Sequence, residues 1–312
     1  MLPPLKLDRP MRLHEANRSS LSSEPIELSL AKMRILVADL VGQASGSPDG
    51  IAFTAAKAAS IHLAAGGRAV RARLALHAAT ACGLCQADGV ALAAVAELLH
   101  NASLVHDDIQ DQTELRRGRN AIWVTFGAEV AVCAGDLLIS AAYAALAGVS
   151  DTTKLPDLLL LIHQRVSAAI RGQCADLHDA AAGEGDLSRY EAIAAAKSGA
   201  LLSLPLEMVF TAAALGGLAL QARVAAERFA IGYQIADDID DLEHDATAQR
   251  GALNIVLLLG TGDAALRKAR WMAQQHLRAA ASATLDLPHG AGSLLRAMAL
   301  QLSDTLAPVA AP

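Results

Sequence analysis

The feature that most limits the fold is a nearly continuous series of apolar segments with helical periodicity, which runs from Ile26 to about residue 306. Apolar residues recur three and four positions apart, the spacing that places side chains on one face of a helix. The strict alternation of a half-buried β-strand persists in no segment. The sequence therefore predicts an all-α fold of about ten or more helices, without strands.

Clusters of turn-forming residues separate these segments, because Gly, Pro, Asp and Ser end helices or start them. Breaks are predicted at Gly46–Gly50, Gly66–Gly67, Gln86–Gly89, Gly148–Pro156, Gly183–Asp186, Gly216–Gly217 and Gly260–Asp263. No change of composition marks a linker, so we predict a single all-α domain over residues 25–306. Residues 1–24, rich in Pro and Ser, are predicted to be a mobile arm, and residues 307–312 a loose tail.

Composition and charge exclude several classes of function. Hydrophobic residues make up 53% of the chain but aromatic residues only 3%, so the core must consist mainly of Ala, Leu, Val and Ile, which suit close helix packing. The net charge of −6 gives no general attraction to nucleic acid or to an anionic membrane.

The longest nearly uncharged stretch, residues 208–223, is shorter than the ~20 residues of a membrane span, so no stable membrane insertion is expected. Four cysteines and no signal-peptide pattern at Met1 predict a cytoplasmic protein.

A first Asp motif ends one of the apolar helical segments and consists of Asp107, Asp108 and Asp111. Positions 107 and 111 are four apart and share a helix face, with position 108 about 100° round the axis. Clustered carboxylates repel each other, and a hard cation such as Mg²⁺ relieves that repulsion. The alternative interpretation of this motif on its own is a solvated helix end.

A second Asp motif repeats the arrangement more than a hundred residues later. Asp237, Asp238 and Asp241 have the same D-D-x-x-D spacing and again end an apolar helical segment. Two such motifs suggest facing helices that jointly hold several metal ions and a diphosphate between them.

Basic residues near these motifs point to a phosphate-containing ligand. Arg116 and Arg117 follow the first Asp motif after four residues, close enough for a guanidinium to reach phosphate oxygens. Arg68 and Arg71 open a predicted helix, whose N-terminus favours anions. Lys197 is a lone cation inside an Ala-rich helix; on its own it would be interpreted as a surface lysine.

Taken together, these motifs resemble the all-trans isoprenyl diphosphate synthases, the class I polyprenyl synthetases. The resemblance extends from about Ile26 to at least Asp245 and includes Gly127, the Gly135-Asp136 pair, the run from Gly172 to Asp176 and the Tyr233-Gln234 pair. It implies the isoprenoid synthase type I fold, a single helical bundle around a central cavity. It also implies a homodimer that acts on small-molecule substrates and needs Mg²⁺.

The resemblance assigns roles residue by residue. Three Mg²⁺ ions would be coordinated by Asp107, Asp111 and Asp237, with Asp108, Asp238 and Asp241 supporting the two clusters. Catalysis would depend on these motifs and on Lys197. The allylic diphosphate would be held by Arg116, Lys197, Ser198 and Gln234, with Gln173 and Asp176 lining the same site. Isopentenyl diphosphate would be bound by Arg68, Arg71, His100 and Arg117.

The chemistry implied by the resemblance is a head-to-tail prenyl transfer. The allylic diphosphate ionises to a cation and pyrophosphate, so charge develops on a leaving group that metals and basic side chains must already surround. Isopentenyl diphosphate then attacks the cation and loses a proton, which the departing pyrophosphate accepts. Aliphatic walls around the cation neither hydrate nor trap it.

The residues near the first Asp motif bear on product length. Relatives that make farnesyl diphosphate place an aromatic ring five residues before the first Asp, where this chain has Ala102 followed by Ser103. The two-residue insertion of many bacterial farnesyl-making relatives is also missing from the motif. Tyr143 could supply a floor deeper in the tunnel. We therefore predict geranylgeranyl diphosphate, a C20 product, with farnesyl or longer polyprenyl diphosphates as the competing predictions.

One departure from the family pattern and two alternative functions remain. The lysine-containing stretch that follows the second Asp motif in the family is replaced by residues 246–256, in which Arg250 could stand in for one lysine. A class I terpene cyclase, a lyase, shares the fold and the first motif but has no use for a second diphosphate site. A noncatalytic synthase subunit tends to lose an Asp motif, whereas this chain keeps both.

Overall fold

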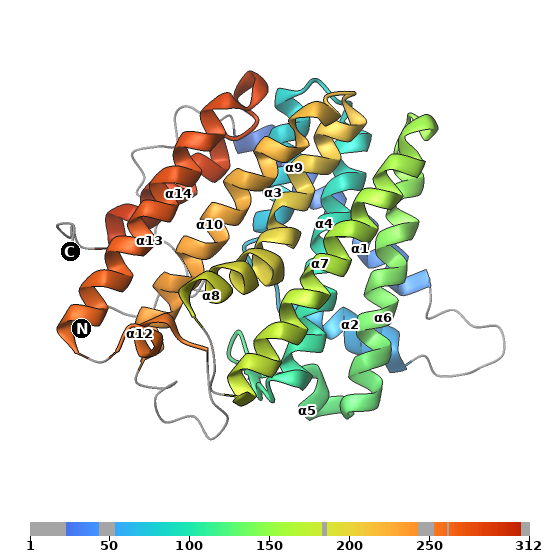
Figure 1. Cartoon of the computed structure of the whole chain (residues 1–312). Coiled ribbons are helices and arrows are strands. Elements are labelled where there is room, and N and C mark those ends of the chain that lie inside the picture. The colour runs from blue at the N-terminus through green and yellow to red at the C-terminus, as the bar shows by residue number, and fades with distance from the viewer. Residues whose placement is uncertain (1–22, 44–53, 183–185, 243–252, 261, 307–312) are drawn as a thin grey trace. The chain divides into compact units, whose positions relative to one another are not determined.

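The computed structural model describes residues 23–43, 54–182, 186–242, 253–260 and 262–306 (Figure 1). Nearly all of the described residues in regular structure are helical, which confirms the all-α prediction. Two compact units are present: an N-terminal unit that extends to Leu159 and a C-terminal unit that continues from Leu160. The single domain over residues 25–306 stays a prediction. Most of the predicted arm, the predicted tail and Arg250 lie outside the described residues.

The described part of the N-terminal unit consists mainly of helices (Figure 1). Its elements are α1 (Ser23–Gln43), α2 (Thr54–Ala64), α3 (Val70–Ala81), α4 (Gln86–Gln110), β1 (Leu115–Arg116), β2 (Arg119–Asn120), α5 (Ile122–Phe126), α6 (Ala128–Ala145), the 3₁₀ turns η2 (Leu146–Gly148) and η3 (Thr152–Lys154), and the start of α7 (Leu155–Ala182).

Helix α4 is central to this unit and packs against α1, α3 and α6. Close approach is possible because the contact residues are small: the Cα of Gly89 lies so near α3 that an added Cβ would be 3.2 Å from the Cβ of Ala79. The middle of α4, from Gly89 to Ala96, is buried throughout. This packing holds the end of α4, which carries the first Asp motif, on a rigid support.

A two-residue β-hairpin follows α4, and the sequence analysis did not predict it. Leu115 pairs with Asn120 and Arg116 with Arg119, and the turn between them is Arg117-Gly118. Both turn residues have positive φ, 55° and 75°, as a type I′ hairpin turn requires. Strands of two residues are too short to produce an alternating pattern, so periodicity gave no signal for them.

The C-terminal unit contains the remainder of α7 and the later helices (Figure 1). Its further elements are α8 (Leu187–Ala194), the π-helical turn η4 (Ala195–Gly199), α9 (Ala200–Ala212), the 3₁₀ turn η5 (Gly216–Leu218), α10 (Ala219–Asp240), α12 (Ile255–Leu258), α13 (Asp263–Ala283), the 3₁₀ turns η6 (Thr284–Asp286) and η7 (Pro288–Gly290), and α14 (Ser293–Thr305). Helix α10 packs against α9 and α13, and α13 packs against α14.

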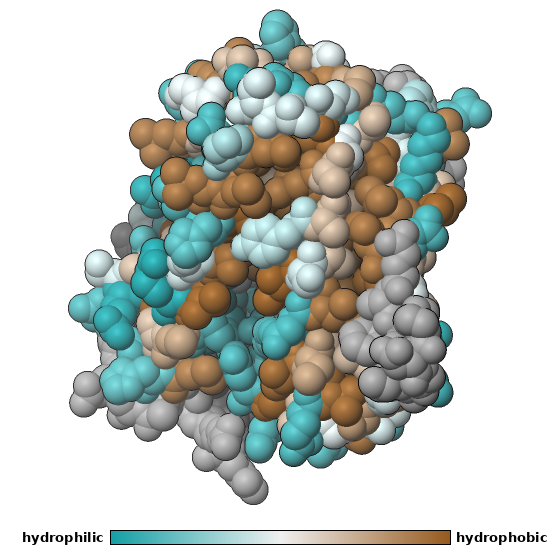
Figure 2. Space-filling model, turned by 90° about the vertical axis from the view of Figure 1, so that its right-hand side faces the viewer, coloured by the Kyte–Doolittle hydropathy of each residue, from teal (hydrophilic) through white to brown (hydrophobic). Residues whose placement is uncertain are grey.

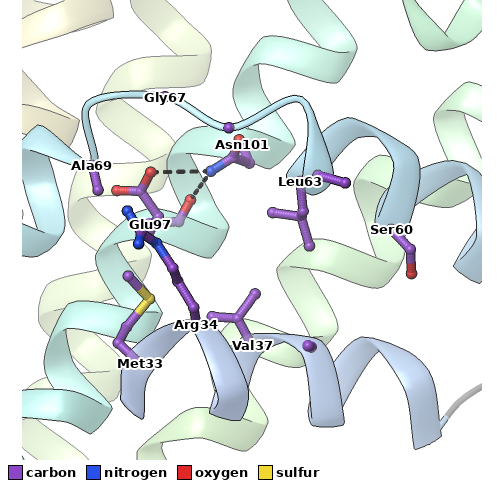
Figure 3. A pocket seen from close by; sticks show the side chains of 12 residues that line it. Met33, Arg34, Val37, Ser60, Leu63, Gly67, Ala69, Glu97 and Asn101 are labelled. Carbon is purple, nitrogen blue, oxygen red and sulfur yellow. Dashed lines mark hydrogen bonds between the residues drawn. The ribbon is translucent and has the colours of Figure 1, made fainter. Parts of the chain in front are cut away.

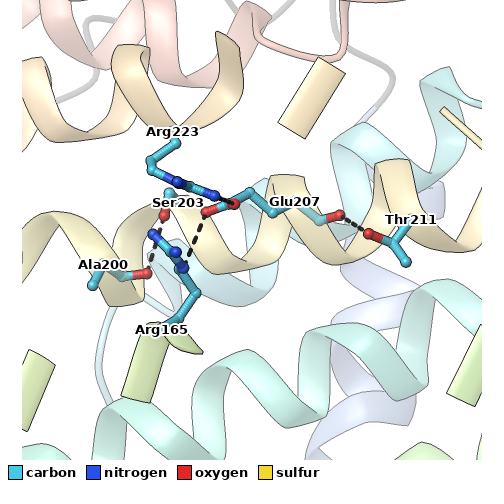
Figure 4. A network of polar contacts seen from close by, with 6 residues as sticks. All are labelled: Arg165, Ala200, Ser203, Glu207, Thr211 and Arg223. Atoms are coloured by element: carbon cyan, nitrogen blue, oxygen red, sulfur yellow. Dashed lines mark hydrogen bonds and ion pairs between the residues drawn. The ribbon is translucent and has the colours of Figure 1, made fainter. Parts of the chain in front are cut away.

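A buried polar network ties three helices of the C-terminal unit together (Figure 4). Glu207 of α9 is fully buried and accepts a hydrogen bond of 2.9 Å from Nη2 of Arg223 on α10. Nε of Arg165 on α7 lies 3.9 Å from the other carboxylate oxygen. A buried carboxylate is tolerated only when paired, so this network fixes α7, α9 and α10 relative to one another.

Most predicted helix breaks that can be compared with the structure are confirmed, at 66–67, 148–156, 216–217 and 260–263. The break predicted at Gln86–Gly89 is wrong, because these residues form the first turn of α4. The chain turns earlier, at Cys82–Cys85, and Sγ of Cys85 caps the helix by accepting a hydrogen bond from Asp88 N. The break at 46–50 and residues 183–185 lie outside the described residues.

Three helical stretches are long and apolar enough to cross a membrane, judged by length and composition alone: Gln86–Gln110, Ala128–Gly148 and Leu187–Ala212. Their apolar windows are 72%, 44% and 78% buried within the fold. Since most of the first and third windows is covered by other parts of the protein, their hydrophobicity is that of core helices. The absence of membrane insertion stays a prediction.

Candidate active site

The first Asp motif lies at the C-terminal end of α4, in the N-terminal unit. Asp111 ends the helix, and its backbone N–H donates to the Asp107 carbonyl over 2.8 Å. The side chain of Asp108 is buried, with the residue only 1% exposed, while Asp107 is partly exposed and Asp111 exposed. The three carboxylates therefore divide into a buried one and two more accessible ones on another face of the helix.

Asp108 is bound by an arginine from the hairpin. Arg116 on β1 donates to Oδ1 of Asp108 from Nε over 2.9 Å, and Nη2 contacts the same oxygen. Burial raises the pKa of Asp108, and the hydrogen bond and charge of Arg116 oppose that rise. The resemblance assigned Arg116 to the allylic diphosphate; in this structure the side chain is oriented by Asp108.

A basic cluster in the same unit brings together three of the four residues assigned to isopentenyl diphosphate, namely His100, Arg71 and Arg117. His100 on α4 is surrounded by the charges of Arg71 and Arg117, and burial together with these charges lowers its pKa well below the usual value of 6.5. The guanidinium of Arg117 lies across Gly67, where an added Cβ would be 2.8 Å from Nη2. A neutral imidazole between two guanidinium groups suits an anionic ligand, to which it can donate a hydrogen bond. Arg68 lies in the loop between α2 and α3, beside Gly67.

Glu97 is a half-buried acid beside this cluster that the sequence analysis missed. Burial raises its pKa, and the charges of Arg71 and Arg117 oppose the rise. Glu97 accepts a hydrogen bond of 3.4 Å from Nδ2 of Asn101 and faces a cavity of about 420 Å³, toward which Arg34 also points (Figure 3). A lone acidic residue inside the apolar sequence of α4 was the signal that could have revealed it.

The second Asp motif ends α10, in the C-terminal unit, and its middle member is again buried. Asp238 is 4% exposed and accepts three hydrogen bonds: from the Tyr190 hydroxyl over 2.7 Å, from Nε2 of Gln234 over 2.8 Å and from the Ile255 backbone N–H over 2.8 Å. Its backbone carbonyl accepts from Nδ2 of Asn254 over 2.8 Å. Burial, followed by the charge and the hydrogen bond of Asp238, raises the pKa of Tyr190 well above its usual value of 10.

Neither Tyr190 nor Asn254 was singled out by the sequence analysis. Tyr190 had no recognisable pattern, since it comes from α8, 48 positions away from Asp238. Asn254 could have been identified as a helix cap, because its side chain accepts from Val256 N at the start of α12. Gln234, assigned to the allylic diphosphate, is committed to Asp238 in this structure.

Lys197 lies in the π-helical turn η4, where Ser198 is its neighbour, and its ammonium group pairs with Asp176 of α7. Gly172, one turn before Asp176, lies against the backbone of η4, so close that a Cβ there would be 2.3 Å from Lys197 N. Gln173 is 7% exposed, and its side-chain amide has no hydrogen-bond partner among the described residues. An amide that is buried and unpaired in the protein alone is suited to contact a ligand.

The carboxylates fit Mg²⁺ by their chemistry, although they form no complete metal site by themselves. Across residues 23–306, apart from the gaps, no three His, Cys, Asp or Glu side chains are grouped to hold an ion. Each Asp motif instead offers two carboxylates that are more exposed than its buried member: Asp107 and Asp111 in one unit, Asp237 and Asp241 in the other. One or two carboxylates are what Mg²⁺ takes when water and phosphate oxygens complete its shell.

The residues considered for product length occupy different environments. Ala102 is 1% exposed on α4, and Ser103 donates its hydroxyl to the His100 carbonyl over 2.9 Å. Tyr143, near the end of α6, is 40% exposed. Ala102 is therefore buried in its unit, whereas Tyr143 lies at the surface; the roles of these residues in product length stay predictions.

Comparison with known proteins gives a consistent result. The family model for polyprenyl synthetases matches residues 54–255. The chain is 32% identical over 192 residues to a short chain isoprenyl diphosphate synthase of Methanothermobacter thermautotrophicus, covering 60% of this chain and 58% of the relative. It is 33% identical over 202 residues to a farnesyl diphosphate synthase of Geobacillus stearothermophilus, covering 60% of this chain and 66% of the relative. The matched part thus spans less than two thirds of these relatives.

Solved structures resemble the fold over a longer range. A decaprenyl diphosphate synthase from Rhodobacter capsulatus has a TM-score of 0.74 at 19% identity, covering 91% of this chain and 99% of the other. A geranylgeranyl pyrophosphate synthetase from Pyrococcus horikoshii has a TM-score of 0.75 at 22% identity, again covering 91% and 99%. At this level of identity the likeness establishes the fold.

Proposed function

Because this chain belongs to the polyprenyl synthetase family, we propose that it is a prenyltransferase that condenses isopentenyl diphosphate with an allylic diphosphate, head to tail and in the trans configuration. The proposed product is a mid-length polyprenyl diphosphate. Two Asp motifs and two sets of basic residues are the features from which this reaction is derived.

The observation that carries the proposal is the basic cluster around His100. The positive charges of Arg71, Arg117 and Arg116 lower the pKa of His100. Arg116 also donates a hydrogen bond to Asp108 of the first Asp motif. An anion-binding cluster therefore adjoins a carboxylate motif suited to a metal-bound diphosphate. A condensing enzyme needs two diphosphate sites of this kind, whereas a cyclase needs one.

In the proposed mechanism, Mg²⁺ held by Asp107 and Asp111 and by Asp237 and Asp241 would neutralise charge on the leaving diphosphate. Asp108 orients Arg116 by the Nε hydrogen bond, so this guanidinium is already aimed before ligand binds. Lys197 supplies a further positive charge, which Asp176 holds in place until a diphosphate competes for it. The buried amide of Gln173 gains a partner when the allylic substrate enters.

For product length we propose geranylgeranyl diphosphate, supported by the buried position of Ala102, which has no ring to stop the chain early. Replacing Ala102 with Phe is expected to shorten the product, because the ring would occupy space next to the first Asp motif. Product sizing by chromatography of the dephosphorylated alcohols tests this. An unchanged product from Ala102→Phe would show that the chain does not pass this residue, and farnesyl or longer products from the unmodified protein would replace the C20 proposal.

The experiment that tests the reaction uses the purified full chain with Mg²⁺, isopentenyl diphosphate and, separately, dimethylallyl, geranyl and farnesyl diphosphate. The expected result is an elongated prenyl alcohol after dephosphorylation. A hydrocarbon formed without isopentenyl diphosphate would instead identify a terpene cyclase. Absence of any product, with recovery when a partner synthase is added, would identify a noncatalytic subunit.

We also propose that the protein is a cytoplasmic homodimer. The four cysteines are all free thiols, which agrees with a reducing compartment. Figure 2 shows apolar side chains across the face that it presents. On α6, Val132 and Tyr143 are 44% and 40% exposed. Exposed apolar helix surface is typical of a protein interface. Light scattering after size-exclusion chromatography tests the oligomer, and a monomer at micromolar concentration would contradict it.

A further inference from the structure

Asp238 is enclosed by protein donors rather than directed at a ligand. A carboxylate has two oxygens and about four lone-pair directions. Three of these directions are occupied by the Tyr190 hydroxyl, the Gln234 amide and the Ile255 backbone N–H, all within 2.8 Å. With 4% of the residue exposed, little of the carboxylate is left for a metal ion and its hydration shell.

The donors to Asp238 come from three helices that meet at this one residue. Tyr190 belongs to α8, Gln234 to α10 itself, and Ile255 is the first residue of α12. Asn254, the cap of α12, adds a hydrogen bond to the Asp238 carbonyl over 2.8 Å. The last turn of α10 is therefore fixed by contacts from both α8 and α12.

That turn also carries the two outer carboxylates of the second Asp motif. Asp237 and Asp241 are four positions apart and share one face of the helix, while Asp238 lies about 100° round the axis. That turn cannot rotate about the helix axis without breaking the hydrogen bonds from Tyr190, Ile255 and Asn254, which come from α8 and from the start of α12. Fixing Asp238 thus fixes the direction in which Asp237 and Asp241 project.

Tyr190 is the one donor in this set that is both a side chain and remote from α10 and α12. It is 2% exposed, and its charged neighbours are Asp238, Asp176 and Asp237. An ionised carboxylate can only accept hydrogen bonds, so the hydroxyl of Tyr190 is the donor in its hydrogen bond with Asp238.

We infer that Tyr190 is a positioning residue of the proposed reaction, one that fixes Asp238 through its hydroxyl and thereby aims Asp237 and Asp241 at the metal-bound diphosphate; this inference rests on the proposed function. Nothing in this role requires Tyr190 or Asp238 to touch substrate or metal. It differs from a purely structural role in that loss of the hydroxyl should weaken the binding of Mg²⁺ with pyrophosphate as well as lower stability.

The test compares Tyr190→Phe with a matched control, Thr284→Val. Thr284 is also in the C-terminal unit, is 4% exposed and donates its hydroxyl over 2.7 Å, but to the Ala281 carbonyl, away from the Asp motif. Calorimetry of Mg²⁺ with inorganic pyrophosphate is measured for both variants and for the unmodified chain, next to the melting temperature. Tyr190→Phe is expected to need about tenfold more Mg²⁺ for half-maximal pyrophosphate binding, while Thr284→Val binds as the unmodified chain does.

Steady-state kinetics give a second readout. Tyr190→Phe is expected to lower kcat and leave the KM for isopentenyl diphosphate within about twofold, because that substrate is assigned to residues of the N-terminal unit. Unchanged binding of Mg²⁺ with pyrophosphate by Tyr190→Phe, with a lowered melting temperature, would reduce Tyr190 to a structural residue and overturn the inference. The calorimetric arm requires no turnover, so the inference and the proposed reaction can fail separately.

A second variant keeps the inference testable if Tyr190→Phe does not fold. Asn254→Ser preserves a cap for α12, since Ser is a good N-cap residue, but its side chain is too short to reach the Asp238 carbonyl. It should weaken the binding of Mg²⁺ with pyrophosphate in the same direction as Tyr190→Phe. Binding equal to that of the unmodified chain would contradict the idea that contacts around Asp238 aim the outer carboxylates.

Discussion

The two Asp motifs are nearly identical in sequence but are anchored in opposite ways. In the first, the buried Asp108 is held by a charged arginine, and in the second, the buried Asp238 is held by a phenol, an amide and a backbone N–H, all of them neutral. The arginine cancels one negative charge of the first motif, whereas the neutral donors leave the charge of the second motif in place. The same D-D-x-x-D spacing can therefore present two different net charges to a metal–diphosphate complex.

The largest expected effect tests the ion pair between Asp108 and Arg116, which we call the ionic anchor of the first Asp motif. Asp108→Ala should lower turnover by about a hundredfold or more, because Arg116 loses the group that aims it. It should also cost about 1–3 kcal/mol in the free energy of unfolding, since a guanidinium is left without its carboxylate. Turnover assays and urea unfolding followed by circular dichroism measure both quantities.

A double variant separates the two consequences. Asp108→Ala with Arg116→Ala should regain part of the lost stability, since no unpaired charge remains, but none of the lost turnover. If turnover of Asp108→Ala is close to normal, the ionic anchor has no role in catalysis.

The next effect concerns the ion pair between Lys197 and Asp176, which lies in the C-terminal unit together with the second Asp motif. Lys197→Ala should lower turnover by about a hundredfold with helicity intact, because a positive charge facing the leaving group is lost. Lys268→Ala, an exposed lysine on α13 in the same unit, is the matched control and should be near normal. Equal turnover in the two variants would remove Lys197 from the mechanism.

A smaller effect is expected from the close contact that supports Lys197. Gly172→Ala introduces a Cβ that would be 2.3 Å from Lys197 N, so the π-helical turn must shift. Turnover should fall about tenfold, with an overpacking cost of about 1–3 kcal/mol. Gly217→Ala, where nothing lies within 4 Å of the added Cβ, should change neither quantity. A fully active Gly172→Ala would mean that the turn adjusts without moving the ammonium group.

The smallest effect is a pH dependence of stability in the N-terminal unit. The pKa of His100 is lowered by burial and by Arg71 and Arg117, so the unfolded chain takes up a proton below about pH 6.5 that the folded chain does not. Stability should therefore fall as the pH drops below 6.5, by at most about 1.4 kcal/mol per pH unit from this group. His100→Gln should give a shallower slope between pH 6.5 and 5 in urea unfolding, and parallel curves would refute the assignment.

The difference between the anchors also explains what the sequence could reveal. Arg116 lies eight positions after Asp108, and its proximity was visible as an R-R-G sequence after the motif. The hairpin that turns it back was not visible, because two-residue strands leave no periodic signal. Tyr190 lies 48 positions before Asp238 and reaches it only through the packing of α8, so no local pattern pointed to it.

Helical periodicity predicted the elements better than their ends. The Gly-containing breaks at 66–67 and 216–217 were recognisable by their turn residues. The one at Gln86–Gly89 was misplaced because Gly89 serves close packing against Ala79 inside α4, not a turn. A glycine in a sequence does not by itself reveal whether it is there for its backbone freedom or for its lack of a side chain.

The π-helical turn Ala195–Gly199 has a consequence for how this segment tolerates change in length. Its i→i+5 hydrogen bonds accommodate one more residue than the α-helical turns of α8 and α9 on either side. Helices α8 and α9 thus form one continuous helix, in which the extra residue of the π-helical turn shifts the side-chain positions of α8 by one residue relative to those of α9. Deleting Ala196 would bring them into phase as a regular helix and rotate every preceding side chain, including Tyr190, by about 100° relative to α9. One residue of chain length, rather than any side chain, keeps Tyr190 and Lys197 in register with their carboxylate partners.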